Sequence, residues 1–340
     1  MAMKREQMTR RNFLGISTTG LLMASLAPGE SAGQTSPSWE KRLHIPDSSA
    51  IRILQFTDVH FFNGTGRWPQ REEKQRLKTL DDMRRLIDHA KPDVLLVTGD
   101  LWHDNPDGRG AEFMVYAVEQ CGGLGIPWAF TWGNHDQLDD YAMGHKALAE
   151  AKNTLYAGME SDGNYVLALE DGNGARLAEV FCLNTRATGV HDEARQFIGD
   201  AAAVLDERGN RVMRVAAFHI PVKQYEDVWD GGIARGVIGE NVCMEQEDGA
   251  SLPIARTAGI QAMFCGHDHV NDYSGVMDGV DMIYGRATGH NGYGADKVAK
   301  GAKLYTLDPA RKALEWVSLL PDGTSWKPGA EERTDTRRRL

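Results

Sequence analysis

The sequence predicts an α/β fold in which two sheets pack together and helices cover them on the outside. Two observations favour this class. Between Ile51 and Trp132, short apolar strands alternate with longer amphipathic helices. The second half of the chain is instead rich in strand-like segments, with glycine-containing joints at 171–174 and 207–210. An α/β half followed by a strand-rich half is typical of two packed sheets with helices outside.

The first half opens with a βαβ unit. The apolar run Ile51–Phe56 precedes a segment of helical periodicity at 74–90 and a buried strand at 93–98. A helix at 111–122 and a third strand at 126–132 follow. In the second half, apolar runs predict strands at 165–170, 178–183, 212–218, 260–264, 282–284, 303–307 and 314–319.

Length and composition indicate an ordinary globular protein. The 340 residues are 41% apolar and 25% charged, which is enough to bury a core without disulfide support. With a net charge of -10, the protein lacks the basic surface that binding of polymeric DNA or RNA requires, so no such partner is expected. A small anionic substrate is compatible with this charge where a local cation offsets it.

The first 32 residues resemble a twin-arginine export signal. Arg10 and Arg11 precede an uncharged run at 16–27 that is too short to span a membrane. We therefore expect export by the twin-arginine translocation machinery to the periplasm or the medium, without a stable membrane span. The alternative is a disordered tail or an uncleaved anchor helix. Disulfides are allowed in that compartment, and the sequence leaves open whether Cys121, Cys182, Cys243 and Cys265 pair.

Potential metal ligands follow five of the predicted strands. They are Asp58 and His60, Asp100, Asn134 and His135, His219, and His267 and His269. Because binding sites of α/β sheets lie beyond the carboxyl ends of the strands, we expect these side chains to converge. Residues at i and i+2 of an extended segment share a face, so Asp58 with His60, and His267 with His269, are each expected to face a common point.

The chemistry of this set points to transition metals. Imidazoles and carboxylates with one amide suit Zn, Mn or Fe better than Ca or Mg, and the ligands are too many for one ion. Two metal ions can share a carboxylate and clamp the oxygens of an in-line phosphoryl displacement. Each cluster alone is weak evidence of a functional site. Gly-Asp after a strand, for example, is commonly a helix cap. The ordered set of five is far more specific.

This ordered pattern resembles the calcineurin-like metallophosphoesterases over about residues 51–320. The matching motifs are Asp-x-His at 58–60, Gly-Asp at 99–100, Gly-Asn-His-Asp at 133–136, His219, and Gly-His-Asp-His at 266–269. The segments 218–221, 266–272, 284–285 and 292–294 further resemble a purple-acid-phosphatase-like subgroup. We therefore expect the twin-arginine signal at 1–32, a linker at 33–50, the metallophosphoesterase domain at 51–322 and a charged tail at 323–340, of which 329–340 is loose.

The fold that the resemblance implies is a four-layer α/β-β/α sandwich with two metal ions. The implied ligands are Asp58, His60 and His269 for one ion and Asn134, His219 and His267 for the other, with Asp100 bridging. His135 would contact the phosphate and assist the leaving group. The implied reaction is hydrolysis of a phosphate ester by in-line attack of a metal-bridging hydroxide.

One position departs from the purple acid phosphatases, which place an iron-ligating tyrosine three residues after the bridging aspartate. His103 stands there, so we predict a colourless enzyme and leave the metal open between Fe, Mn and Zn. His103 and Asp104 either orient His135, line the substrate mouth or belong to a solvated loop. His290 either touches substrate or is loop filler.

Two rival functions stay open. The same site can cleave diesters, which makes a phosphodiesterase acting on nucleotides or lipid head groups an alternative. A non-catalytic metal- or phosphate-binding envelope protein is an alternative of another class, although the complete ligand set with His135 argues against it. A serine hydrolase is excluded, because the single G-x-S-x-G match, at 29–33, lies in the signal region with no strand before it.

Overall fold

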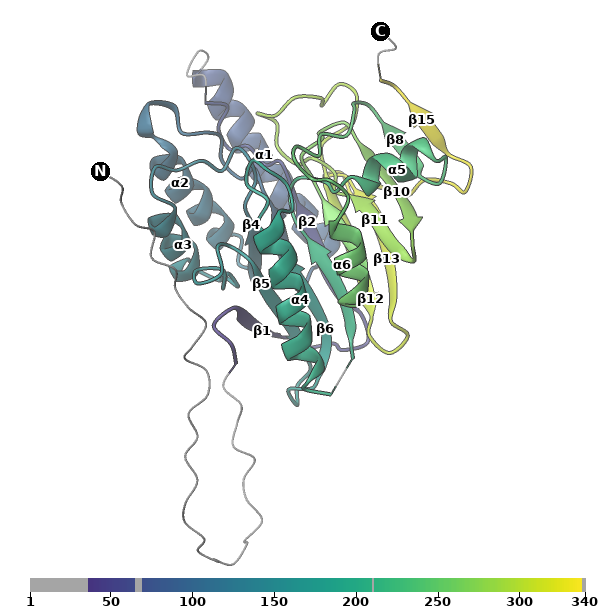
Figure 1. The fold of residues 1–340 in the computed structure, drawn as a ribbon. Coiled ribbons are helices and arrows are strands. Elements are labelled where there is room, and N and C mark those ends of the chain that lie inside the picture. The colour runs from purple at the N-terminus through teal and green to yellow at the C-terminus, as the bar shows by residue number, and fades with distance from the viewer. Residues whose placement is uncertain (1–35, 65–68, 210, 338–340) are drawn as a thin grey trace, which may run out of the picture. The chain divides into compact units, whose positions relative to one another are not determined.

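The structure is a computed structural model that describes residues 36–64, 69–209 and 211–337. The predicted export signal at 1–32 lies outside the described residues. Residues Pro37–Leu340 form one compact unit, and its strands form two mixed sheets (Figure 1). The strand order is β14-β13-β12-β2-β3-β4 in the six-stranded sheet and β1-β5-β6-β7-β9-β11-β10-β8-β15 in the nine-stranded sheet.

The six-stranded sheet holds the βαβ unit. Its strands β2, β3 and β4 are parallel, and β12 pairs antiparallel with β2 and continues into a hairpin with β13. Apolar side chains of three helices pack on it, among them Met83, Phe113 and Leu148. The bounds are β2 Ile51–Phe56, β3 Val94–Thr98, β4 Trp128–Thr131, β12 Ala302–Asp308, β13 Ala313–Leu319, β14 Ser325–Trp326, α1 Pro69–Ala90, α2 Gly110–Gly123 and α3 Tyr141–Glu150.

The nine-stranded sheet carries the remaining helices on its outer face, where α4 and α6 pack side by side (Figure 1). Its strands are β1 Glu40–His44, β5 Tyr165–Glu170, β6 Arg176–Cys182, β7 Met213–Ala217, β8 Arg235–Ile238, β9 Ile260–Cys265, β10 Asp272–Met277, β11 Val280–Tyr284 and β15 Arg333–Asp335. The helices are α4 Asp192–Asp206, α5 Gln224–Asp230 and α6 Ser251–Thr257, and a short 3-10 turn, Pro106–Gly108, precedes α2.

Alternation along the central strands explains the layering. Val180 faces the core shared with the six-stranded sheet, whereas the next residue, Phe181, packs against the outer helices. Val215 and Ala216 alternate in the same way. Because successive side chains of a strand point to opposite faces, one sheet can serve two cores. The predicted four-layer α/β-β/α sandwich is confirmed.

All ten predicted strands and both predicted helices are confirmed, with ends that differ by a few residues. Two segments expected to lack regular structure contain strands. β1 lies in the predicted linker. Its polar sequence gives no strand signal, because an edge strand pairs with β5 through backbone groups and does not need apolar side chains. The predicted charged tail at 323–340 contains β14 and β15, and β15, in the part expected to be loose, pairs with β8 although its three side chains are exposed.

The sequence leaves cysteine pairing open and predicts no stable membrane span. All four cysteines lie within the described residues and are free thiols; Cys121, Cys182 and Cys265 are buried and Cys243 is exposed. Within the described ranges, no helix has the length and apolar character needed to cross a membrane.

Candidate metal centre

The predicted ligands gather where the two sheets meet. Asp58 and His60 follow β2, Asp100 follows β3 and Asn134 follows β4, all in the six-stranded sheet. The remaining histidines, His219, His267 and His269, follow β7 and β9 of the nine-stranded sheet. The site is therefore built from the carboxyl ends of strands of both sheets, and each sheet supplies part of the ligand set.

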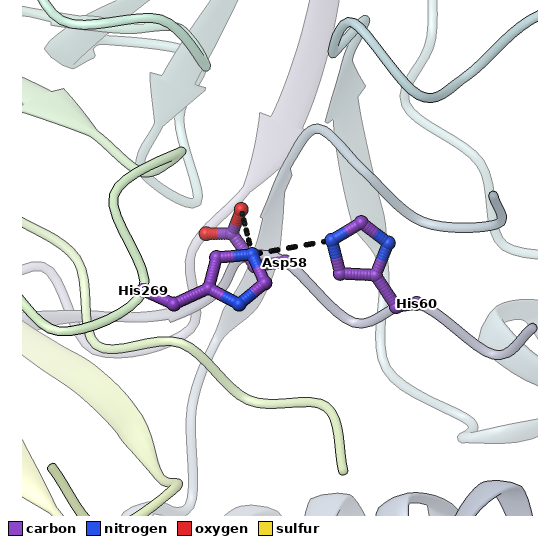
Figure 2. A group of neighbouring side chains, drawn as sticks. All are labelled: Asp58, His60 and His269. Atoms are coloured by element: carbon purple, nitrogen blue, oxygen red, sulfur yellow. Dashed lines mark hydrogen bonds and ion pairs between the residues drawn. The ribbon is translucent and has the colours of Figure 1, made fainter. Parts of the chain in front are cut away.

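One group of donors consists of Asp58, His60 and His269. Figure 2 shows His269 with one ring nitrogen directed at both of the others. Its Nε2 lies 3.3 Å from Asp58 Oδ1 and 3.2 Å from His60 Nε2. All three side chains are buried, and their donor atoms lie within 4.8 Å of one another. This is a compact arrangement of one carboxylate and two imidazoles.

The second group consists of Asp100, His219 and His267, with Asn134 beside it. His219 Nε2 lies 3.2 Å from Asp100 Oδ2, 3.3 Å from His267 Nδ1 and 3.0 Å from Asn134 Oδ1. Asp100 also reaches the first group, because its Oδ2 lies 3.4 Å from His60 Nε2. One carboxylate oxygen thus stands between the two donor groups.

Backbone carbonyls orient three of the four imidazoles. His60 Nδ1 lies 3.2 Å from the carbonyl oxygen of Trp102. His219 Nδ1 lies 2.9 Å from that of Thr98, and His269 Nδ1 lies 3.4 Å from that of Tyr293. A proton on Nδ1 leaves Nε2 free to bind a metal ion, and such partners fix the ring orientation. His267 is reversed: its Nδ1 faces the centre and its Nε2 lies 3.8 Å from Glu245 Oε1.

The electrostatics of the centre favour positive charge between the carboxylates. Burial opposes ionisation of Asp58 and Asp100, but His269 and His219 outweigh it and hold both carboxyl pKa values below the usual range. Burial lowers the pKa of His219, yet Asp100 and Asp58 outweigh it and raise that pKa to about 10. Burial lowers the pKa of His267 to about 4. The two carboxylates therefore favour positive charge beside them, where a metal ion would lie.

These residues fit a pair of transition-metal ions. Asp58 Oδ1 is buried and takes part in no hydrogen bond of good geometry, although His269 Nε2 lies 3.3 Å from it. A buried carboxylate oxygen in this position is costly unless a cation lies against it. His60 and His269 turn Nε2 atoms toward each other, each with its Nδ1 facing a backbone carbonyl. Imidazole nitrogen and carboxylate oxygen in these proportions are the donors that Zn, Mn and Fe prefer.

The reason for convergence differs from the one predicted. Asp58, His60 and His267 have φ values of 52°, 40° and 76°, so their backbone is left-handed and not extended. The expectation that each i and i+2 pair faces a common point is right for Asp58 and His60, which share a donor group, although their backbone is not extended. It is wrong for His267 and His269, which serve different donor groups. Left-handed backbone is uncommon outside glycine and concentrates at functional sites.

A glycine permits the close approach of the two loops. A Cβ at Gly133 would lie 2.3 Å from Asp100 Oδ1 and 2.5 Å from the Asp100 nitrogen, closer than real atoms come. The loop after β4 can therefore reach the loop after β3 only with glycine at this position.

His135 borders the centre without belonging to either donor group. Its backbone N–H donates to Asp100 Oδ1 at 2.9 Å, and its ring stacks on His103 with centroids 4.4 Å apart. The ring Nδ1 lies 2.7 Å from Asp104 Oδ1. The geometry agrees with two of the alternatives, because Asp104 and His103 contact the His135 ring and His103 also lines the cavity over the donor groups. His103 Nδ1 also lies 3.1 Å from His60 Nδ1. The other ring nitrogen of His60, Nε2, is the one that faces His269.

His290 is not at the metal centre. Its Nε2 lies 2.7 Å from Asp82 Oδ2 on α1, and its backbone N–H donates to Thr79 Oγ1 at 3.0 Å. The interpretation that it touches substrate is therefore not supported, because its imidazole is already bound to α1. The residue fastens the glycine-rich loop after β11 to that helix.

Sequence reasoning assigned no role to several residues around the centre. The buried Asp136 accepts N–H groups of Asp100, Leu101 and Gly133, each at 2.8 Å, and so ties two ligand loops together. A cavity of about 510 Å³ opens over the donor groups, and Cys243, Glu245 and Tyr293 line it beside His135 and His267. Asp136 was detectable as the last residue of Gly-Asn-His-Asp, whereas the others lie in loops without a motif.

The chain belongs to the calcineurin-like phosphoesterase family, whose model matches residues 51–271. The predicted family is thereby confirmed. Two similar proteins from Arabidopsis thaliana are named probable inactive purple acid phosphatase 29 and 28. Each is 25% identical to this chain. The match to phosphatase 29 covers 96% of this chain and 93% of the relative, and the match to phosphatase 28 covers 84% of this chain and 82% of the relative.

Solved structures share the fold. A purple acid phosphatase from yellow lupin seeds matches 87% of this chain and 55% of its own length, with a TM-score of 0.52 and 13% identity. A dimetal phosphatase from Danio rerio matches 79% of this chain and 98% of its own, with a TM-score of 0.50 and 11% identity. At these identities the likeness concerns the fold.

Proposed function

We propose that the chain is a dinuclear-metal phosphoesterase that hydrolyses small phosphate esters. The observation that carries the proposal is the position of Asp100 Oδ2, 3.4 Å from His60 Nε2 of one donor group and 3.2 Å from His219 Nε2 of the other. A carboxylate placed in this way is suited to bridge two metal ions. Family membership and the fit of the donor set support the same reading.

Each residue has a defined part in this proposal. Asp58, His60 and His269 would hold one ion, Asn134, His219 and His267 the other, and Asp100 both. Two bound ions would supply an acidified water and positive charge for the phosphoryl oxygens. His135 contributes its outward Nε2, because Asp104 engages Nδ1. That nitrogen is placed to donate a proton to the leaving oxygen, which is general acid catalysis.

The test is turnover of p-nitrophenyl phosphate by protein loaded in turn with Fe, Mn and Zn, with and without chelator. We expect hydrolysis that chelation abolishes. Asn134→Ala should lose metal together with activity, whereas His135→Ala should keep both ions and lose activity. A His135→Ala variant with both ions and full turnover would contradict the proposed role of His135. Bis(p-nitrophenyl) phosphate, assayed in parallel, distinguishes monoesterase from diesterase activity.

A second candidate is a metal- or phosphate-binding protein without turnover. The word "inactive" in the names of the Arabidopsis relatives favours it. It predicts two bound ions, phosphate binding and no hydrolysis of either ester with any of the three metals. The presence of His135 and Asp104 at hydrogen-bond distance favours catalysis instead.

We also propose that the protein acts in the periplasm or outside the cell. The support is the Arg10-Arg11 pair followed by the short uncharged run. Cell fractionation should find the protein outside the cytoplasm, and Arg10→Lys with Arg11→Lys should retain it inside. Cytoplasmic retention of the unaltered chain would contradict export.

A further inference from the structure

A second cavity borders the metal centre on the side of Asn134. Its volume is about 430 Å³, and its walls include Gly133, Asn134, Tyr141, Asp162, Arg186 and Thr188. His135, the next residue along the loop, lines the first cavity. The loop after β4 therefore borders both cavities, and a substrate whose phosphate lies at the metal centre has a second space within reach.

The feature that gives this space a chemistry is Arg186, in the loop after β6. Its guanidinium carbon lies 4.2 Å from the centre of the Tyr141 ring, at the start of α3. Its Nη2 donates to Asp162 Oδ1 at 2.6 Å. Stacking and this ion pair fix the plane of the guanidinium, so less entropy is lost when a ligand binds to it.

One edge of this guanidinium is left for a ligand. Among the described residues, no hydrogen bond or ion pair involves Nη1, and the Arg186 side chain is 31% exposed. Asp162 is the one carboxylate of the cavity wall, and its contact with Nη2 already uses it. A planar guanidinium with a free N–H edge is suited to a carboxylate or a phosphate. The Arg186 side chain covers one face of Tyr141, which leaves less room there for stacking of an aromatic group.

We propose that Arg186, held by Tyr141, binds a second anionic group of the substrate. The substrate class is then phosphate esters whose alcohol part carries a carboxylate or a further phosphate. This inference rests on the proposed hydrolysis at the metal centre and adds the part of the substrate that is not hydrolysed. Arg186 determines specificity and takes no part in the chemical step.

The experiment compares esters that differ in the second group. Glycerol 3-phosphate, 3-phosphoglycerate and glycerol 1,3-bisphosphate carry none, a carboxylate and a phosphate, respectively. We expect kcat/KM at least tenfold higher for the two-anion esters than for glycerol 3-phosphate. Arg186→Gln should reduce that preference at least tenfold.

Arg85→Gln is the matched control. It removes the same charge from an exposed position on α1, where Arg85 pairs with Asp81 at 2.9 Å, and should leave the preference unchanged. Equal kcat/KM for the three esters, or a preference that Arg186→Gln does not change, would overturn the proposal. Thermal unfolding midpoints of all variants report whether they fold.

Binding separates this inference from the proposed function. Calorimetric titration of the metal-loaded protein with 3-phosphoglycerate should show affinity at least tenfold weaker in Arg186→Gln, whether or not the ester is hydrolysed. If no ester is turned over, including p-nitrophenyl phosphate, the proposed hydrolysis fails while this titration still tests the subsite. Equal affinity in both proteins would refute the subsite alone.

Discussion

His135 Nδ1 lies 2.7 Å from Asp104 Oδ1, and both residues belong to loops that follow parallel strands of the six-stranded sheet. The Asp104 backbone N–H also donates to the His135 carbonyl at 2.7 Å. Backbone and side chain thus join the same two residues, and His103 stacks on the His135 ring. The imidazole is therefore held with one defined nitrogen toward the cavity.

Asp104→Asn tests this pair. We expect kcat to fall about tenfold to a hundredfold, because the amide is a poorer acceptor for the His135 Nδ1–H than the carboxylate and orients the ring less firmly for donation of its Nε2 proton. The content of metal should not change, since Asp104 belongs to neither ligand set. Steady-state kinetics with metal analysis measures both. Asp107→Asn, an exposed carboxylate of the same loop, is the control and should retain kcat. Loss of metal from Asp104→Asn would show that the residue acts on the centre itself.

Gly133→Ala tests the packing between two ligand loops. The added Cβ would meet Asp100 Oδ1 at 2.3 Å and displace the carboxylate proposed to bridge the ions. We expect metal affinity to fall at least about tenfold, as happens when groups that position metal ligands are altered. Competition with a chromogenic chelator measures the affinity. Gly123→Ala at the end of α2, where a Cβ meets nothing within 4 Å, should keep it. Equal affinities in the two variants would contradict the packing argument.

Removal of the metal ions should destabilise the fold. Ions that bind only the native state add RT ln(1 + [L]/Kd), about 4 kcal/mol at a thousandfold excess over Kd. We therefore expect chelation to lower the midpoint of thermal unfolding and added metal to restore it. Scanning calorimetry of Asp100→Asn should show a much smaller effect of chelator. A midpoint that does not respond to chelator in the unaltered chain would argue against a native metal centre.

The order of motifs made the composition of the site predictable. Metal ligands that follow strands had to converge, because the parallel strands within each sheet end at one edge. Residues such as Asp58 and His219 could therefore be placed together although they lie far apart in the chain. The division of His267 and His269 between two donor groups came from the family resemblance. The left-handed backbone at His267 has no sequence signal, because histidine seldom adopts it.

Other parts of the structure depend on contacts that leave no pattern in the sequence. β15 pairs through its backbone with exposed side chains, so neither alternation nor an apolar run marks it. Arg186 reads as an ordinary loop residue until the fold brings α3 beside it. Tertiary contact creates the role of such residues, whereas a strand such as Ile51–Phe56 carries its own signal.

Glu40 provides a test of acid stability at the edge of the nine-stranded sheet. It is 7% exposed, and its Oε1 accepts from Arg176 Nη2 at 2.9 Å and Arg42 Nε at 3.0 Å, while Arg208 donates to Oε2. Burial raises the pKa of this carboxyl, but Arg176 and Arg208 outweigh burial and hold the pKa below its usual 4.5. A folded-state pKa below the unfolded one gives stability that is present above about pH 4.5 and lost as pH falls.

Glu40→Gln should therefore lower the free energy of unfolding by about 1–3 kcal/mol at pH 7. The charge-assisted hydrogen bonds from the three arginines are lost, and the neutral amide of glutamine is a weaker acceptor for them. The difference from the unaltered chain should shrink as pH falls below about 4.5, because the native glutamate then becomes protonated as well. Urea unfolding followed by circular dichroism at pH 7, 5 and 4 measures this. Glu160→Gln, an exposed carboxylate, should leave stability unchanged at each pH. A penalty for Glu40→Gln that stays constant with pH would mean that packing, and not charge, makes Glu40 stabilising.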